Sequence, residues 1–448
     1  MGKPVNPNSK PTETRSMLLN IGPSHPAMHG IVRIIAELDG ETVLGTEVEI
    51  GYLHRAFEKM CEQGPYNNAI PYTDRLNYVS PLINNIGYCL AIEKLLGINT
   101  TERCQYIRVV MSEISRITDH LTCIGASAME LGAFTVFLYM IKAREFLYDL
   151  IESVTGARLT ISYARVGGLK SDLPPGFSEQ TISAIKETRS VLKEVEGLLN
   201  TNRIFVDRMK NTGTISQEDA LAYGITGPFL RSTGVDYDVR KTQSYLVYDK
   251  LDFDIPVGEH GDNLDRYYVR MEEMHQSMRM IEQALQKMPG GDIMVDTKGR
   301  VIPAAMMVDE AKAGRTQGLH EVEVDLDPTL YGSTKRFHEN VYAKEKNVSL
   351  PAKEDTYGNI EGLMNHFKLV IEGVKIPKGE VYSVVEGANG ELGFYLVSDG
   401  SGRPYRVRVR PPCFFGMAAL GQMLKGHFIS DIITTFGMIN MIGGECDR

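Results

Sequence analysis

Several long stretches of the chain keep apolar residues three and four positions apart, and this spacing constrains the fold more than any other feature. It predicts amphipathic helices of 20 residues or more. These span residues 74–96, 101–126, 133–155, 178–200 and 263–288. Helices about 30 Å long that are joined by modest loops pack most economically as a bundle. An α-solenoid is not favoured, because no internal repeat accompanies the helices.

Strand-like patterns flank the helical region. Residues 31–38 lead into Asp39-Gly40 and residues 42–50 return, which predicts an antiparallel hairpin. Short β-rich runs near the other end precede a helix at about 421–434. The fold class is therefore mainly helical α+β. The expected order is a disordered tail (1–16), a β-hairpin domain with a histidine loop (17–51), a helical bundle (52–291), a polar insertion (292–357) and a C-terminal α+β segment returning to the bundle (358–448).

Charge and motif content exclude several classes of function. A net charge of −9 argues against nucleic-acid binding, which needs a surplus of Lys and Arg. No apolar run reaches the roughly 18 residues of a spanning helix. No dinucleotide loop, phosphate loop or H-E-x-x-H motif is present. The six cysteines form no C-x-x-C pair, so we expect this chain to hold no metal, iron–sulfur cluster or other cofactor of its own.

Two histidines lie in the motif Gly22-Pro-Ser-His-Pro-Ala-Met-His-Gly30. Its prolines and glycines oppose a helix, so His25 and His29 are predicted on a tight loop before the hairpin. They are either surface residues or proton donors, since histidine titrates near neutrality. A zinc site would need a further ligand, and none is near in the sequence.

Two further side chains are candidates for proton chemistry. Tyr78 is expected at the start of the helix over 74–96, where a tyrosine is also a common core or interface residue. Glu130 stands in otherwise apolar sequence, and a carboxylate there must be paired or functional because burying it alone is costly. A loop histidine, an acid and a tyrosine could together deliver protons to a quinone, but the residue types alone do not select that reaction.

The histidine motif resembles the loop of the quinone-site subunit of respiratory complex I, the 49-kDa-type (D-type) subunit of NADH:quinone oxidoreductase. Further family motifs follow in order over nearly the whole chain, apart from the tail and most of 298–357. They are Gly51–Lys59, Asp74–Ser80, Gly156–Arg158, Glu218–Ala220, Arg240–Gln243, Asp262–Tyr267, His366–Lys368, Lys425–His427 and the terminal Gly444-Glu-Cys-Asp-Arg448. The family shares its scaffold with the large subunit of nickel–iron hydrogenases, whose metal-binding C-x-x-C motifs are missing here.

The resemblance implies roles for individual residues. His29 and Tyr78 correspond to the residues that hydrogen-bond the two quinone carbonyls, and His25 to a neighbour in the loop. Arg55 corresponds to an arginine near the terminal iron–sulfur cluster, which a partner subunit carries. Such a chain is active only inside a proton-translocating assembly, with the cluster-bearing subunit, other peripheral-arm subunits and membrane-arm subunits as partners. Its expected location is peripheral, on the cytoplasmic face of the bacterial inner membrane. A ferredoxin- or F420-dependent quinone oxidoreductase built on the same scaffold is the alternative.

Two departures from the family pattern carry information. Glu130 stands where well-known members have the aspartate that partners the loop histidine. Thr160 stands where many members have a histidine that interacts with the terminal cluster. A threonine cannot titrate near neutrality, so we expect a cluster of lower and nearly pH-independent potential. Such a cluster favours menaquinone over ubiquinone as the acceptor.

Overall fold

The computed structural model describes residues 16–26, 30–295, 348–351 and 353–448. The predictions of a disordered tail and of a polar insertion therefore fall largely outside the described residues. His29 also lies outside them, whereas His25, Arg55, Tyr78, Glu130 and Thr160 are described.

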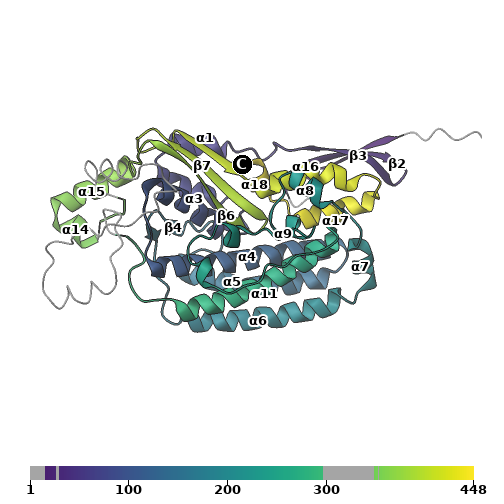
Figure 1. Ribbon diagram of the computed structural model, residues 1–448, viewed down its shortest axis with the longest axis horizontal. Coiled ribbons are helices and arrows are strands. Elements are labelled where there is room, and N and C mark those ends of the chain that lie inside the picture. The colour runs from purple at the N-terminus through teal and green to yellow at the C-terminus, as the bar shows by residue number, and fades with distance from the viewer. Residues whose placement is uncertain (1–15, 27–29, 296–347, 352) are drawn as a thin grey trace, which may run out of the picture.

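The N-terminal part is a three-stranded antiparallel sheet in the order β1 (Met17–Ile21), β2 (Arg33–Asp39) and β3 (Thr42–Glu49). Asp39 pairs with Thr42, so the predicted hairpin at Asp39-Gly40 is confirmed. The register shifts between Glu37 and Leu38, as a β-bulge does. Figure 1 shows this sheet at one end of the molecule. β1 precedes the histidine loop and β2 follows it, so the sheet fixes both ends of that loop.

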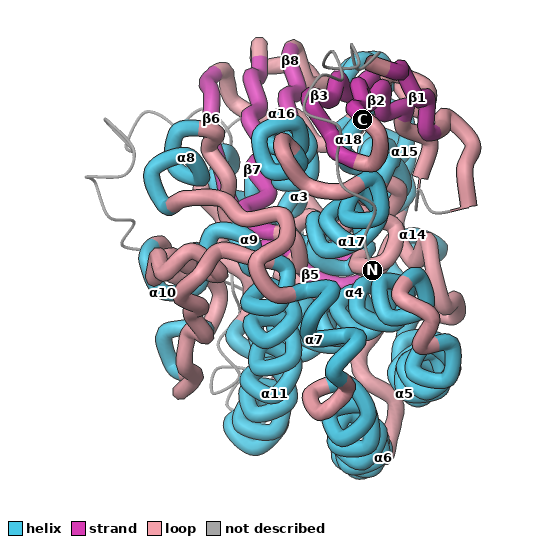
Figure 2. The backbone as a smooth tube through the Cα atoms, turned by 90° about the vertical axis from the view of Figure 1, so that its right-hand side faces the viewer, coloured by secondary structure: helices cyan, strands magenta, loops and turns pink. Residues whose placement is uncertain are grey.

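Four of the predicted long helices form the bundle. They are α4 (Glu102–Glu130), α5 (Phe134–Thr155), α6 (Phe177–Leu199) and α11 (Asn263–Lys287), and they run side by side (Figures 1 and 2). The Thr101 side chain caps α4 by accepting from the backbone N–H of Cys104, and Asp262 caps α11 from Asp265 in the same way. α4 packs against α5 and α11 within the bundle and against α3 and α17 outside it. It is the helix that joins the bundle to the rest of the fold.

A second antiparallel sheet consists of β6 (Gly379–Gly387), β7 (Gly390–Ser398) and β8 (Arg406–Arg410), in that order. It packs on α3 (Pro81–Leu96). A Cβ atom placed on Gly87 would lie only 2.8 Å from a methyl carbon of Val385, so the absence of a side chain there permits the close approach. The helix predicted over 74–96 begins later, at Pro81, so the prediction that Tyr78 starts it is wrong. Proline disfavours helical backbone at the residue before it, which explains the difference.

The single helix predicted at about 421–434 is also wrong. Two helices stand there, α16 (Pro412–Leu424) and α17 (Ile429–Ile439). The turn between them pairs with the edge of β3, because Val43 donates its N–H to the carbonyl oxygen of His427 at 2.8 Å and accepts from Gly426 at 2.8 Å. Gly426 has a φ of +83°, a conformation that ends helices. A last short helix, α18 (Gly443–Asp447), is entirely buried.

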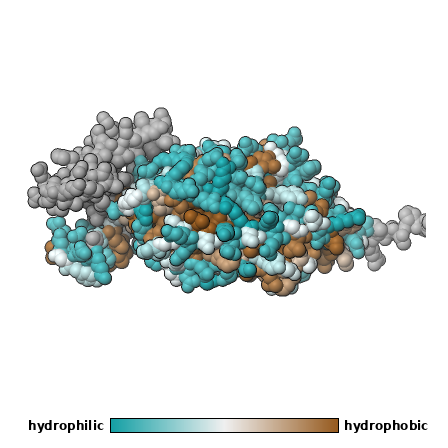
Figure 3. Space-filling model, turned by 90° about the horizontal axis from the view of Figure 1, so that it is seen from below, coloured by the Kyte–Doolittle hydropathy of each residue, from teal (hydrophilic) through white to brown (hydrophobic). Residues whose placement is uncertain are grey.

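Short elements complete the described part of the chain. They are α1 (Phe57–Gln63), η1 (Tyr66–Ala69), α2 (Ile70–Thr73), β4 (Ala164–Arg165), β5 (Gly168–Leu169), α7 (Arg203–Met209), α8 (Gln217–Ala222), α9 (Gly227–Arg231), α10 (Val239–Thr242), η2 (Tyr248–Lys250), α14 (Lys353–Gly358) and α15 (Ile360–Ile371). α14 and α15 form a small lobe at the opposite end from the first sheet (Figure 1), and apolar side chains show on it (Figure 3). Within the described ranges, no helix is long and apolar enough to cross a membrane.

Candidate functional site

Tyr78 lies on a tight turn between α2 and α3. The Asn77 side-chain oxygen accepts from the backbone N–H groups of Val79 at 3.2 Å and Ser80 at 3.3 Å. This local bonding holds the backbone in a turn that competes with the helix. The side-chain amide of Asn84, one turn inside α3, donates to the Asn77 carbonyl at 2.9 Å. The turn that carries Tyr78 is thus fixed to the helix that follows it.

The carboxylate of Asp119, on α4, also holds this turn. Its Oδ2 accepts from the Asn77 amide at 2.7 Å and from the Ser80 hydroxyl at 2.8 Å, one on each side of Tyr78. Its Oδ1 accepts from the Asn440 amide at 2.7 Å. Asp119 is fully buried, so these three bonds replace the water that a carboxylate would otherwise need. The sequence interpretation did not single out Asp119.

The Tyr78 side chain itself is 38% exposed, so its ring is available to a ligand or a partner chain. Burial of the rest of the side chain raises the pKa of its hydroxyl. The negative charge of Asp119 and the Cys413 thiol raise that pKa further, whereas the Arg55 guanidinium lowers it. Tyr78 is therefore a neutral hydrogen-bond donor throughout the physiological pH range.

Arg55 links the segment after β3 to the Tyr78 turn and to the C-terminus. Its Nη2 donates to the carbonyl oxygens of Arg75 at 2.6 Å and Gly444 at 3.1 Å. Burial lowers the pKa of Arg55, and the positive charge of Arg75 lowers it further. Two guanidinium groups thus lie close together beside Tyr78 and supply positive charge there.

The C-terminal helix α18 also contacts the segment that carries Arg55. Asp447 Oδ2 accepts from the backbone N–H groups of Gly51 at 2.9 Å and Leu53 at 2.7 Å, and its carbonyl oxygen lies 2.8 Å from Nδ1 of His54. These contacts join the motif over 51–59 to the last residues of the chain. Both segments were predicted as family motifs, and the structure shows that they lie in contact.

The pair Gly443-Gly444 lies between the histidine loop and the Tyr78 turn. A Cβ atom placed on Gly444 would lie 2.4 Å from the carbonyl oxygen of Arg75, and one placed on Gly30 would lie 3.5 Å from the backbone nitrogen of Gly443. Gly30, the residue directly after His29, therefore packs on the same two glycines as the turn that carries Tyr78. A side chain at position 444 would push α18 away from the turn that carries Tyr78.

The loop that carries Thr160 contacts the same region. Asp74 Oδ2 accepts from the Ser162 backbone at 2.9 Å and from its hydroxyl at 3.0 Å. Thr160 is exposed and has a φ of +51°, which is uncommon for a residue with a side chain. Because Asp74 precedes Arg75, the loop lies near the two guanidinium groups.

The remaining predicted residues lie at the edge of this arrangement. His25 is exposed, and Glu130 is partly buried at the last position of α4. Eleven residues separate Asp119 from Glu130, which corresponds to roughly 16 Å along the helix. The carboxylate behind Tyr78 is thus Asp119, and Glu130 stands three turns further along α4.

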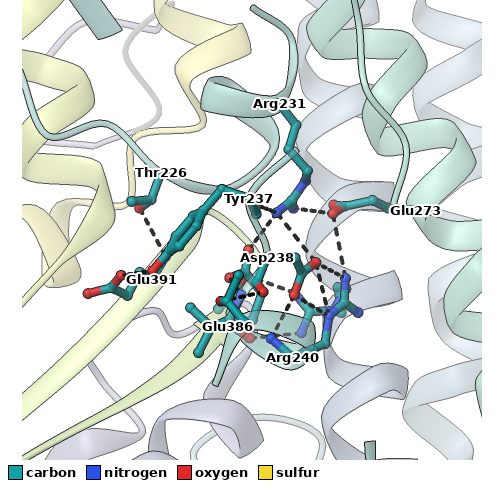
Figure 4. Close-up of polar contacts among 12 residues, drawn as sticks. Thr226, Arg231, Tyr237, Asp238, Arg240, Glu273, Glu386 and Glu391 are labelled. Atoms are coloured by element: carbon teal, nitrogen blue, oxygen red, sulfur yellow. Dashed lines mark hydrogen bonds and ion pairs between the residues drawn. The ribbon is translucent and has the colours of Figure 1, made fainter. Parts of the chain in front are cut away.

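A second buried polar cluster lies deeper, where α9, α10, α11 and β6 meet (Figure 4). Arg231 is ion-paired with Glu273, with Asp238 at 3.4 Å and with Glu386 at 2.9 Å. Arg240 is ion-paired with Asp238 at 2.6 Å. These side chains have almost no contact with solvent and form ion pairs with one another, so the cluster is a structural element of the interior.

Comparison with known proteins defines the class first. Residues 130–327 and 330–448 match the family described as respiratory-chain NADH dehydrogenase, 49 Kd subunit. The matched ranges include most of the segment over 298–357 that the motif comparison left out. Within the part of the chain that the structure describes, no group of three or more His, Cys, Asp or Glu side chains could hold a metal ion.

The relatives then define which component of the enzyme this is. The chain is 49% identical to the D-type subunit of NADH-quinone oxidoreductase from Myxococcus xanthus, over 97% of this chain and 94% of that protein. It is 50% identical to the first D-type subunit of Sorangium cellulosum, over 96% and 95%. A C/D-type subunit of Bdellovibrio bacteriovorus is 47% identical over 99% of this chain and 72% of that longer protein. The chain belongs to the family of D-type, or 49-kDa, subunits of NADH-quinone oxidoreductase, the multisubunit enzyme complex I, and the predicted family and fold class are confirmed.

Proposed function

We propose that this chain forms, with its iron–sulfur partner, the site at which quinone accepts two electrons and two protons. The observation that carries the proposal is the packing of two segments on Gly443-Gly444. One segment ends at Gly30, next to His29, and the other carries Tyr78. Segments 45 residues or more apart in the sequence are thereby held side by side, and each supplies a side chain able to donate a proton.

Tyr78 is the donor to one quinone carbonyl. Its hydroxyl is neutral and its ring is partly exposed, which fits a flat, apolar headgroup with an oxygen at its edge. His29 donates to the other carbonyl, His25 assists from the same loop, and Glu130 holds His29 by a hydrogen bond. A carboxylate beside an imidazole favours its protonated form, which would help to supply protons.

Arg55 and the Thr160 loop face the partner's terminal cluster. The pair of guanidinium groups at Arg55 and Arg75 supports this role, because positive charge stabilises a site through which electrons pass. The chain itself holds no cofactor, and the electrons come from the partner. Thr160 makes the cluster a low-potential donor, which favours menaquinone as the acceptor.

The partners follow from membership in complex I. They are the cluster-bearing subunit, other peripheral-arm subunits and the membrane-arm subunits. The C/D-type fusion in Bdellovibrio bacteriovorus supports the C-type subunit as a neighbour of this chain. We place the chain peripherally, on the cytoplasmic face of the bacterial inner membrane. The donor is NADH, because the relatives named above are all subunits of NADH-quinone oxidoreductases.

Substitution of Tyr78 by Phe tests the proposal, because it removes the hydroxyl and keeps the ring. Loss of one buried hydrogen bond costs about 1–3 kcal/mol, which corresponds to a rate about 5- to 150-fold lower. The assay is NADH-driven quinone reduction by the assembled complex, normalised to reduction of an artificial acceptor that takes electrons upstream of the quinone. Tyr405→Phe, on a 69% exposed tyrosine before β8, is the control and should keep the normal rate. A normal rate for Tyr78→Phe at all quinone concentrations would refute the role.

A further inference from the structure

A continuous chain of buried hydrogen bonds runs from Asp119 to a second carboxyl, that of Glu445 in α18. The Asn440 amide that donates to Asp119 also lies 2.6 Å from the Asn389 side-chain oxygen. The Asn389 amide lies 3.4 Å from the Cys413 sulfur, and that thiol donates to Glu445 Oε2 at 2.9 Å. Asp119 and Glu445 are thus connected through side chains of the turn before β7, of α16 and of the end of α17.

Glu445 is buried in the interior of the fold. It is 2% exposed, and Cys413 and Asn389, its neighbours in the chain of bonds, are both buried. The charged and titratable groups around it come from the elements packed on α18. They are Arg55 and His54, which contact the carbonyl oxygens of Gly444 and Asp447, Asp119 of α4, Arg410 of β8, Cys413 of α16, and Cys446, Asp447 and Arg448 beside it in sequence. No guanidinium or ammonium group forms an ion pair with Glu445 among the described residues, in contrast to the carboxylates of the deeper cluster in Figure 4.

We propose that Glu445 is a positioning residue for proton transfer by Tyr78: as a neutral acid it leaves the bonds between Asp119 and the Tyr78 turn undisturbed, and its ionisation slows proton donation. The inference rests on the proposed quinone site. It goes beyond that site because Glu445 does not touch the quinone and acts only through Asp119 and Tyr78.

The direction of the effect follows from the charges. Burial raises the pKa of Glu445 to about 7, and the charge of Asp119 raises it too, whereas the bonds from Cys413 and Asn389 and the charge of Arg410 lower it. As pH rises through this value, Glu445 loses its proton and becomes a second negative charge at the far end of the chain of bonds from Asp119. The two carboxylates then repel each other, which disturbs the bonds by which Asp119 holds the Tyr78 turn. Proton donation to the quinone therefore slows on the alkaline side.

The pH profile of quinone reduction by the assembled complex tests this inference. The native enzyme should lose activity by about three- to tenfold between about pH 6.5 and 8.5. Glu445→Gln stays neutral at every pH and should keep the rate of the acid side throughout. Glu445→Asp can still ionise and should retain the decline. Glu62→Gln is the matched control, because Glu62 accepts hydrogen bonds from Arg406 and from the backbone of Val407. Its profile should follow that of the native enzyme.

A second variant guards against failure of Glu445→Gln to assemble. Asp119→Asn removes the charge that raises the pKa of Glu445, so the alkaline decline should move to lower pH. The inference is overturned if the native enzyme shows no decline or if Glu445→Gln declines as the native enzyme does. It is also overturned if Glu62→Gln abolishes the decline equally, or if Asp119→Asn leaves the midpoint of the decline unchanged. Tyr78→Phe separates the two proposals. A normal rate for that variant refutes the quinone site itself, whereas a slow Tyr78→Phe with an unchanged Glu445→Gln profile refutes only the role of Glu445.

Discussion

Asp119 offers a sharp perturbation, because its three acceptor bonds hold the Tyr78 turn on one side and the C-terminal segment on the other. Asp119→Leu leaves the donors on Asn77, Ser80 and Asn440 buried without an acceptor. Each unsatisfied donor costs about 1–3 kcal/mol. Because neighbouring effects do not add fully, the expected loss of stability is about 3 kcal/mol or more. The Tyr78 turn should loosen, and quinone reduction should fall by at least about 10-fold.

Asp119→Asn should be much milder. The new carbonyl oxygen can still accept from Asn77 and Ser80, while the new amide nitrogen faces the donor on Asn440. Asn440 can turn its amide round to offer an oxygen, but it then gives up the bond to Asn389. One exchanged hydrogen bond amounts to a loss of about 1 kcal/mol.

Exchanging Asp119 and Asn440 for each other completes a double-mutant cycle. Asn440→Asp alone places two carboxylates within 2.7 Å of each other, so the charges repel and the variant should be unstable. Combined with Asp119→Asn, it restores one carboxylate and one amide in the same contact. The coupling energy should be favourable by about 0.5–3 kcal/mol. The measurement is the temperature at which the assembled complex loses quinone reductase activity, for the native enzyme, both single variants and the double variant. Additive shifts would show that Asp119 and Asn440 do not share the contact on which this reasoning depends.

Two predictions concern residues at the edge of the site. An experimental structure of the assembled complex should place a ring nitrogen of His29 within about 2.6–3.2 Å of a Glu130 oxygen, or one water away; a wider separation contradicts the proposed pairing. A redox titration followed by electron paramagnetic resonance, between about pH 6 and 8, should find a terminal cluster whose potential hardly changes with pH, and Thr160→His should introduce a pH dependence. A slope near 59 mV per pH unit in the native enzyme would contradict the reasoning from Thr160.

The helical part of the fold is predictable because its signal is local and repeated. The periodicity over 101–126 and 263–288 yields α4 and α11 within a few residues of their ends. The errors occur where a single residue or a distant contact overrides the periodicity. Pro81 delays the start of α3, and pairing of the turn at Gly426 with β3 divides α16 from α17. The first of these was visible in the sequence, whereas the second depends on a strand almost 400 residues away.

The candidate site was predictable only in part. Tyr78 and Arg55 were identified through family motifs. The structure shows that these motifs are in contact, since the Arg55 side chain donates to the carbonyl oxygens of Arg75, in the Tyr78 motif, and of Gly444 in α18. Asp119 was missed although α4 carries a signal for it. Glu113, Arg116 and Asp119 follow one another at intervals of three positions, and His120 is four positions after Arg116. Ile114, Ile117 and Leu121 lie between or beside them, and charged residues buried in such a helix must meet polar partners in the interior. Asn440 and Glu445 gave no such signal, because their importance depends on contacts with residues remote in sequence.

These charged residues of α4 connect two buried polar regions of the fold. Glu113 and Arg116 face the buried ion cluster, where Arg116 donates to the carbonyl oxygens of Glu386 and Gly387 at 2.8 Å. His120 lies 2.8 Å from Glu273 of the same cluster, and the adjacent Asp119 holds the Tyr78 turn. Two turns of one helix thus join the charged interior to the proposed quinone site. An apolar helix would pack as well, but it could slide or rotate at little cost, whereas here any displacement breaks buried ion pairs. Through Asp119, the Tyr78 turn is therefore fixed to a rigid helix, as the proposed proton transfer requires.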